Sequence, residues 1–345
     1  MTHRTRTLWP LAGLAALALT VTACASPSAT AEEDAPSDAA ATILVENARP
    51  TLIQVEEDGE TVWREDGDAA RDSVVVPREP ASVVTFDIAS LDTLHAIGAG
   101  DAVVGIPDAT LPDYLAEYAD LPTVGSLFEP DFEAVAQLAP ELIITAARST
   151  SQYDELSQIA TTIDLTGTSG GTFDVEAGLA RAGQLGEIFG REDEVAELTA
   201  DIEDLLAAIR AEVSGTALVL SISGGEYGAF GEGSRFGYFF DSLGFTPAVV
   251  AADLPGADGS SHGDTVTNEF ILTANPDWIL AFDRGAATGG ESTATETLDN
   301  EIVDRTTAAQ EGRIVQLPGN ELYIVINGLT AIDNVLTTVH DAITG

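Results

Sequence analysis

The sequence contains no lysine and a single cysteine, Cys24, among its 345 residues. All 14 basic residues are therefore arginines, and they stand against 57 acidic residues, which gives a formal net charge of −43 at pH 7. Such a charge repels nucleic acid and anionic lipid headgroups, and it favours an exported protein that self-repulsion keeps soluble. Because positive charge is so scarce, an arginine just past a strand end becomes a candidate binding residue.

Cysteine and histidine are too few for several kinds of site. One cysteine excludes an internal disulfide and leaves no cysteine-based metal centre or thiol catalysis to consider. The four histidines form no His/Asp cluster for free Zn²⁺ or Mn²⁺, and there is no phosphate-binding P-loop. His95 and His340 fall on predicted helices and are expected to be structural. We therefore expect no intrinsic cofactor.

The first 23 residues resemble a bacterial lipoprotein signal peptide. Arg4 and Arg6 form a positively charged start, and the apolar run at 8–21 is too short for a comfortable transmembrane helix. The segment VTAC at 21–24 resembles a lipobox, in which Cys24 becomes the new N-terminus. Lipidation there would anchor the protein to the outer face of the cell membrane. Residues 24–42 are rich in small, polar and acidic residues and are predicted to form a flexible tether.

The rest of the chain alternates between predicted strands and helices, which favours an α/β fold with mostly parallel sheets. After a predicted β-hairpin within 43–76, the alternation fills a first Rossmann-like lobe, 43–172, and restarts in a second, 214–345. Between them, from residue 192 on, apolar residues recur every three and four positions opposite a charged face. We predict one long helix over 173–213, a rigid strut that holds the two lobes at a fixed separation.

The two halves share a sequence pattern centred on a proline. Pro140 and Pro276 each follow a predicted helix and precede an acid and an apolar strand. When the prolines are aligned, one acidic and one basic pair also match: Glu133 with Glu269, and Arg148 with Arg284. Both arginines then stand just past the carboxyl end of a strand, where open α/β sheets bind ligands.

A third arginine, Arg235, lies in the glycine-rich loop GAFGEGSRFG at 228–237, which can bring backbone N–H groups and a guanidinium together. Any one of the three arginines is more often a surface residue in a salt bridge. Three in so acidic a chain suggest a positive pocket for an anion, because arginine stays charged and donates in a fork. Such a pocket could also hold the rings of a ligand through cation–π contacts.

Two further residues could be metal ligands. His262 lies in the polar loop at 259–264, and Tyr323 follows the predicted strand that ends at residue 317. Imidazole and phenolate both suit iron, although a lone histidine in a loop is more often simply solvated.

The segment GTSGG at 167–171 matches the nucleophile-elbow pattern and would make Ser169 the nucleophile of a secreted serine hydrolase. The segment falls at the junction between the first lobe and the predicted strut, where glycines serve as a hinge. Only His262 and His340 follow it in the chain, and the first has a better explanation. We keep the hydrolase as an alternative and expect the protein not to be an enzyme.

Several segments together resemble a known family. From about residue 83 to the end, the chain is similar to the substrate-binding proteins of bacterial iron–siderophore ABC importers. It most resembles the subgroup that binds catecholate-type siderophores, including petrobactin-like and enterobactin-derived ones. The matching segments are VGIP at 104–107, LPDYL at 111–115, GSLFEPDF at 125–132, AAR at 146–148, GSRFG at 233–237, SHG at 261–263, DRG at 283–285 and the region of Tyr323.

The resemblance implies the class III periplasmic-binding-protein fold, in which two α/β lobes are joined by a rigid helix and the ligand lies between them. It implies that Arg148, Arg235 and Arg284 hold an anionic ferric catecholate. It also implies that His262 and Tyr323 complete the coordination of the iron when the siderophore supplies fewer than six donors.

The resemblance further implies a docking role for Glu133 and Glu269, since in related proteins one acid on each lobe contacts arginines of the ABC permease. The alternative is that both are solvated acids that stabilise helix starts through the helix dipole. A protein of this kind is expected to be a monomer that delivers its ligand to the permease. Binding of haem or cobalamin on the same scaffold is another alternative, against which the three arginines and His262 argue.

Overall fold

The computed structural model describes residues 42–50, 52–57, 60–65, 70–167, 171–256 and 262–345. They belong to one compact unit, residues 40–345. The predicted signal peptide, the lipidation site Cys24, residues 24–41 of the predicted tether and the alternative nucleophile Ser169 all lie outside the described residues. No helix within the described ranges is long and apolar enough to span a membrane.

The sheet of the N-terminal lobe is entirely parallel, with the strand order β7-β6-β5-β8-β9. Along β8, Leu142 and Ile144 join one hydrophobic core while Ile143 joins another, because successive side chains of a strand point to opposite faces. Both faces of the sheet are therefore covered, as is usual for a parallel sheet. The strands are β5 (Val83–Thr85), β6 (Val103–Asp108), β7 (Thr123–Ser126), β8 (Leu142–Thr145) and β9 (Thr162–Asp164). The helices between them are α1 (Ile88–Ala96), η1 (Gly100–Ala102), η2 (Asp113–Asp120), α2 (Phe132–Leu138), η3 (Ala147–Gln152) and α3 (Tyr153–Leu156).

The sheet of the C-terminal lobe is mixed, with the order β13-β11-β10-β14-β15 and β12 also paired to β10. The chain turns back after β10 through Gly224 and Gly225, whose positive φ values of 59 and 82 suit a tight two-residue hairpin. This hairpin makes β11 antiparallel to β10, whereas β10, β14 and β15 run parallel. The strands are β10 (Thr216–Ser223), β11 (Glu226–Phe230), β12 (Thr246–Pro247), β13 (Asp264–Val266), β14 (Trp278–Asp283) and β15 (Ile314–Leu317).

Short helices surround this second sheet, and the chain ends in a long one. A π-helical turn, η6 (Glu321–Val325), precedes the last helix, α11 (Leu329–Thr344). The others are α6 (Tyr238–Asp241), η4 (Ala251–Asp253), α7 (Asn268–Ala274), α8 (Arg284–Ala287), α9 (Ala294–Leu298), η5 (Val303–Arg305) and α10 (Thr307–Gln310).

The prediction of a single helix over 173–213 was wrong, because this region forms two helices. They are α4 (Val175–Phe189) and α5 (Glu192–Glu212). Helix α4 ends at Gly190, which has the left-handed conformation (φ 62, ψ 42) that glycine adopts at little cost. The apolar stripe predicted from residue 192 on is nevertheless buried along α5, at Val195, Ile202, Leu206 and Ile209.

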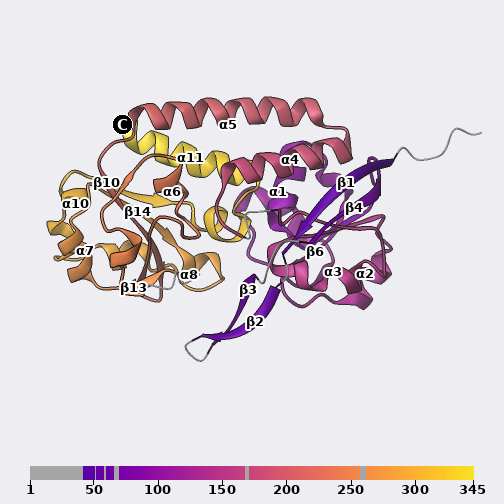
Figure 1. Ribbon diagram of the computed structural model, residues 1–345, viewed down its shortest axis with the longest axis horizontal. Helices are drawn as coiled ribbons and strands as arrows, with labels where there is room; N and C mark the ends of the chain where they lie inside the picture. Colours follow the sequence, from indigo (N-terminus) through magenta and orange to yellow (C-terminus); the bar gives the residue numbers. More distant parts are fainter. Residues whose placement is uncertain (1–41, 51, 58–59, 66–69, 168–170, 257–261) are drawn as a thin grey trace, which may run out of the picture. The chain divides into compact units, whose positions relative to one another are not determined.

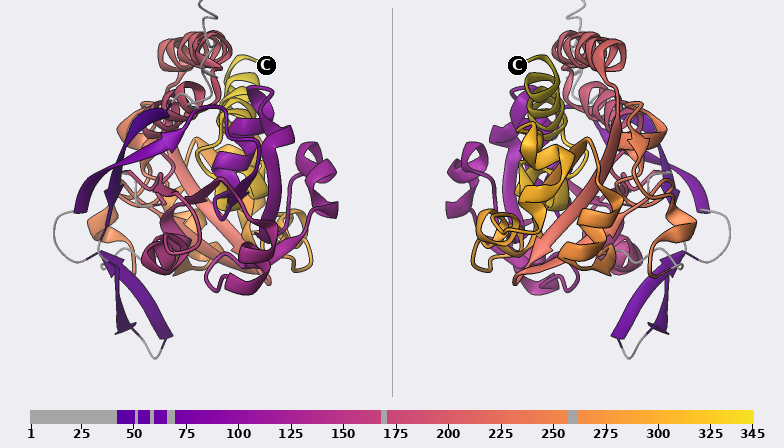
Figure 2. Two further views of the ribbon diagram at one scale, coloured as in Figure 1. Left: turned by 90° about the vertical axis from the view of Figure 1, so that its right-hand side faces the viewer. Right: turned by 90° about the vertical axis from the view of Figure 1, so that its left-hand side faces the viewer.

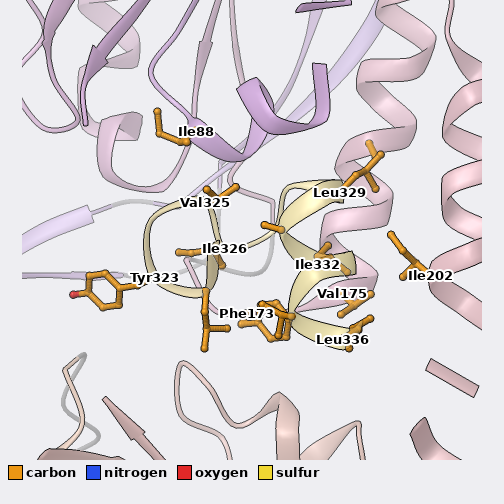
Figure 3. Packing of buried hydrophobic residues seen from close by; sticks show 14 of the residues in the cluster. Ile88, Phe173, Val175, Ile202, Tyr323, Val325, Ile326, Leu329, Ile332 and Leu336 are labelled. Carbon is orange, nitrogen blue, oxygen red and sulfur yellow. The ribbon is translucent and has the colours of Figure 1, made fainter. Parts of the chain in front are cut away.

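Helices α4, α5 and α11 pack together, and α11 also contacts α1 of the N-terminal lobe (Figures 1 and 2). One hydrophobic core joins these helices to both sheets: Ile144 of β8 and Leu280 of β14 belong to it. Part of this core is seen in Figure 3, where Phe173, Val175 and Ile332 lie close together. The two sheets are thus connected through shared buried side chains as well as through the chain itself.

The predicted hairpin within 43–76 consists of two antiparallel ribbons. The first pairs β1 (Thr42–Arg49) with β4 (Ala70–Pro77), and the second pairs β2 (Leu52–Glu57) with β3 (Glu60–Glu65) as a separate sheet (Figure 2). Val45 and Val76 of the first ribbon are buried in the large core, whereas Leu44 and Val75, which are paired across the strands, are exposed.

Candidate ligand-binding site

Two arginines follow strand ends, as the sequence predicted. Arg148 lies in η3, directly after β8, and Arg284 is the first residue of α8, directly after β14. The turn that carries Arg148 includes Ala147, whose φ of 45 is unusual for a residue other than glycine. A hydrogen bond from the Ala147 N–H to Thr166 Oγ1, at 2.7 Å, stabilises this turn.

The third arginine, Arg235, comes from the turn between β11 and α6. Its Nε donates to the backbone oxygen of Gly171 at 3.0 Å, and its Nη2 donates to the backbone oxygen of Tyr323 at 3.1 Å. Its own backbone oxygen accepts from the Phe173 N–H at 3.0 Å. Both the main chain and the guanidinium of Arg235 are therefore fixed by segments that are distant in sequence.

The three arginines meet at Tyr323. The Tyr323 backbone oxygen accepts from Arg148 Nη2, at 3.3 Å, as well as from Arg235. The guanidinium carbons of Arg235 and Arg284 lie 4.4 and 6.0 Å from the centre of the Tyr323 ring, within the range of cation–π contacts. We call Arg148, Arg235, Arg284 and Tyr323 the arginine cluster.

His262 lies beside the arginine cluster. Its Nδ1 is 3.2 Å from the hydroxyl oxygen of Tyr323, and its side chain is exposed. In Figure 3 the Tyr323 hydroxyl points away from the labelled apolar residues of the core. In the ranges that the structure describes, no three His, Cys, Asp or Glu side chains gather to hold a metal ion. His262 and Tyr323 therefore offer one nitrogen and one oxygen atom, side by side, as possible metal ligands at the arginine cluster.

Two arginines of the cluster have lowered pKa values. Burial lowers the pKa of Arg235 to about 10, and the charges of Arg148 and Arg284 act in the same direction. Burial also lowers the pKa of Arg148. None of the three forms an ion pair with another described residue, whereas five other arginines do. An anion bound here would therefore relieve the mutual repulsion of three partly buried cations.

Glu133 and Glu269 occupy matching positions in the two lobes. Each is exposed and is the second residue of its helix, α2 or α7. The N-caps Asp131 and Thr267 accept hydrogen bonds from the first turns of these helices, which explains why both starts are well defined. Docking by these two acids is not tested by their placement and stays a prediction.

Two cavities lie apart from the arginine cluster. One, of about 250 Å³, is lined by the loop at 231–234, by Leu254 and by Asp264. The other, of about 210 Å³, lies between β1, the end of β9 and α4. Neither is lined by an arginine of the cluster, so the two cavities do not define the candidate site.

Comparison with known proteins identifies the family. Residues 83–321 match the family described as "Periplasmic binding protein". The chain belongs to this family. Its relatives include the petrobactin-binding protein YclQ of Bacillus subtilis, 36% identical over 273 residues that cover 78% of this chain and 84% of YclQ. They also include the ferric-anguibactin-binding protein FatB of Vibrio anguillarum, 29% identical over 279 residues that cover 77% of this chain and 83% of FatB.

Solved structures of family members confirm the predicted fold class. The crystal structure of YclQ matches with a TM-score of 0.71 and 32% identity, over 86% of this chain and 99% of YclQ. That of the catecholate-siderophore-binding protein VctP of Vibrio cholerae matches with a TM-score of 0.70 and 29% identity, over 84% of this chain and all of VctP. The predicted resemblance to siderophore-binding proteins is confirmed as well.

Proposed function

We propose that this family member captures a ferric siderophore of catecholate type between its two lobes and delivers it to an ABC permease for iron uptake. The observation that carries the proposal is the meeting of Arg148, Arg235 and Arg284 at Tyr323, with no carboxylate partner among the described residues. A ferric catecholate is an anion with aromatic rings, so it suits both guanidinium charge and cation–π contact. YclQ, FatB and VctP are named for binding siderophores, which supports the same ligand class.

Iron is the cargo in this proposal and arrives with the siderophore. His262 and Tyr323 would supply an imidazole nitrogen and a phenolate oxygen where the siderophore leaves iron positions open. The two side chains are in contact at 3.2 Å, so both can approach one ion. Capture needs no bond to be broken, because charge complementarity and ring contacts hold the complex.

Intrinsic tryptophan fluorescence tests the ligand class. We expect ferric petrobactin and ferric enterobactin to quench the emission of the purified protein at micromolar concentration. Trp278 supports the readout, since it is buried in the C-terminal lobe and reports on its surroundings. Binding of haem or cobalamin in place of the ferric siderophores would overturn the proposal.

Docking to the permease is tested by charge reversal. The double variant Glu133→Arg, Glu269→Arg is expected to stop uptake of radioactive iron–siderophore by cells while the purified protein keeps its affinity. Glu197→Arg, at an exposed position of α5, is the matched control and should leave uptake unchanged. Normal uptake by the double variant would remove the two acids from the interface.

We also propose that the protein acts as a monomer outside the cytoplasm, anchored through a lipid on Cys24. The signal-peptide pattern and the apolar run before Cys24 support this location. Cys24→Ser should abolish the incorporation of radioactive palmitate into the protein. Equal labelling of that variant would exclude Cys24 as the lipid site.

A further inference from the structure

Asn327 lies behind the arginine cluster, four residues after Tyr323, and only 2% of it is exposed. Its Oδ1 accepts from the Asp174 N–H at 3.0 Å, and its Nδ2 donates to the Thr172 backbone oxygen at 2.8 Å. One side chain therefore satisfies both a donor and an acceptor of the segment 172–174. This segment directly follows Gly171, whose backbone oxygen holds Arg235.

Arg235 is aimed by two backbone oxygens, one from Gly171 and one from Tyr323. These oxygens belong to segments that are far apart in sequence, so nothing local fixes the distance between them. The Asn327 side chain connects the two segments directly. The direction in which the guanidinium points consequently depends on this connection.

The turn around Asn327 has a conformation that its surroundings must impose. Ile326 has φ 64 and ψ −81, which a β-branched residue adopts only under strain. The neighbours pack closely against this turn: a Cβ added to Gly178 of α4 would lie 2.9 Å from the Asn327 backbone oxygen, and one added to Gly328 would lie 2.5 Å from Asp92. Figure 3 shows this stretch, with Ile326 lying between Tyr323 and the start of α11.

We propose that Asn327 is a positioning residue for Arg235: by joining 172–174 to the Tyr323 segment, it fixes the two oxygens that aim this guanidinium at the ligand. The proposal rests on the proposed function only for the identity of the ligand. The orientation of Arg235 is a property of the ligand-free protein.

A double-mutant cycle tests the coupling, with ferric petrobactin as the probe. Asn327→Ala should weaken binding about 10-fold, the size of effect expected when a charge-assisted hydrogen bond to the ligand is misdirected. In an Arg235→Ala background the same substitution should cause a clearly smaller loss, with only the contact of Arg148 to the Tyr323 oxygen left to disturb, while in an Arg284→Ala background it should cause the full loss. Additive losses from Asn327→Ala and Arg235→Ala would overturn the proposal.

Asn300→Ala is the matched control for lost hydrogen bonds. The Asn300 side chain accepts from the N–H groups of Ile302 and Val303 and donates to the Thr297 backbone oxygen, away from the arginine cluster. This variant should lower the melting temperature and keep the affinity for the probe. An equal loss of affinity in Asn300→Ala would mean general destabilisation and would overturn the proposal.

If Asn327→Ala does not fold, Asn327→Ser is used in the same cycle. The serine is neutral and polar, but its single hydroxyl cannot replace both the acceptor for the Asp174 N–H and the donor to the Thr172 oxygen. Its loss of affinity should also be clearly smaller in the Arg235→Ala background. A loss of the same size in both backgrounds would overturn the proposal.

A ligand-free measurement separates this proposal from the proposed function. In protein with isotope-labelled arginine, the Nε–H resonance of Arg235 reports its hydrogen bond to Gly171. We expect Asn327→Ala to shift this resonance and speed its exchange with solvent, and Asn300→Ala to leave it unchanged. Failure of the wild-type protein to bind any ferric siderophore would remove the proposed function alone, whereas an unchanged Arg235 resonance in Asn327→Ala would remove the role of Asn327.

Discussion

The outer surface and the arginine cluster hold positive charge in different ways. On the surface, three arginines pair with carboxylates at 2.6 to 3.3 Å: Arg78 with Glu192, Arg210 with Glu176 and Arg313 with Glu311. Inside the cluster, Arg148 and Arg235 donate to backbone oxygens, which carry no net charge. The positive charges of these surface arginines are thus neutralised by neighbouring carboxylates, while the cluster keeps positive charge available for a ligand. Partly burying cations without a counterion costs free energy, which suggests that the arrangement serves binding.

Asp92 is a buried acidic residue that, like the arginine cluster, has no partner of opposite charge among the described residues. Its buried carboxylate accepts from the N–H groups of Thr330 and Ala331, in the first turn of α11, and from the Tyr114 hydroxyl. It forms no ion pair with any described residue, and burial raises its pKa to about 6. Asp92 and the arginine cluster are therefore both held by uncharged polar groups, whereas the three surface arginines named above pair with carboxylates.

The sharpest test of this contrast replaces charge in the arginine cluster. The double variant Arg148→Gln, Arg235→Gln keeps donor groups but loses both charges, and we expect its affinity for ferric petrobactin to fall by at least about 100-fold. Titration calorimetry would measure the change. Arg78→Gln and Arg210→Gln serve as controls, since each removes a surface charge that is already paired. Equal affinities for the cluster and control variants would contradict the difference between the arginine cluster and the paired surface arginines.

The pH dependence of stability tests the buried acid Asp92. Because the pKa of Asp92 is raised from 3.8 to about 6, the folded protein binds this proton more tightly than the unfolded chain does. The stability that results is present at about pH 4 and is lost as the pH rises through about 6. Relative to Asp92→Asn, the free energy of unfolding of the wild type should therefore fall by up to about 3 kcal/mol between about pH 4 and 7. Urea unfolding would measure it, and a pH-independent difference between the two proteins would contradict the expectation.

The smallest effect is expected on the surface. Arg210→Ala removes a pair with Glu176 at 3.3 Å and a hydrogen bond to the Ser242 backbone oxygen at 2.8 Å, both at exposed positions. Solvent screening and side-chain entropy limit the loss of unfolding free energy to less than about 1 kcal/mol. A loss comparable to that at a buried charge would show that the surface pairs do more than neutralise charge.

The sequence was informative about which side chains could form the site. The repeated sequence pattern around Pro140 and Pro276 predicted that Arg148 and Arg284 follow strand ends, and the glycine-rich loop indicated Arg235 as a third candidate. Those positions follow from local pattern, because a strand, its end and a glycine turn are readable from neighbouring residues. The structure then brings these residues together at Tyr323.

The acceptors of the arginine cluster could not be predicted in the same way. Arg235 is held by the backbone oxygens of Gly171 and Tyr323, and every residue carries such an oxygen, so residue type gives no signal. The positive φ of Ile326 could not be predicted from the sequence either, because isoleucine rarely adopts that conformation and only tertiary packing imposes it. The helix break at Gly190 is masked in the sequence, because the apolar periodicity resumes directly after it.

Helix α11 also affects the order in which the two lobes can fold. Its residues follow both sheets in the chain, yet they fill the core that α1 and α4 share, and Asp92 of α1 caps their first turn. Amino-terminal domains usually fold while the rest of a chain is still being made. Here the core of the first lobe would be incomplete until α11 has been made, so this lobe cannot finish folding before the second lobe has been synthesised.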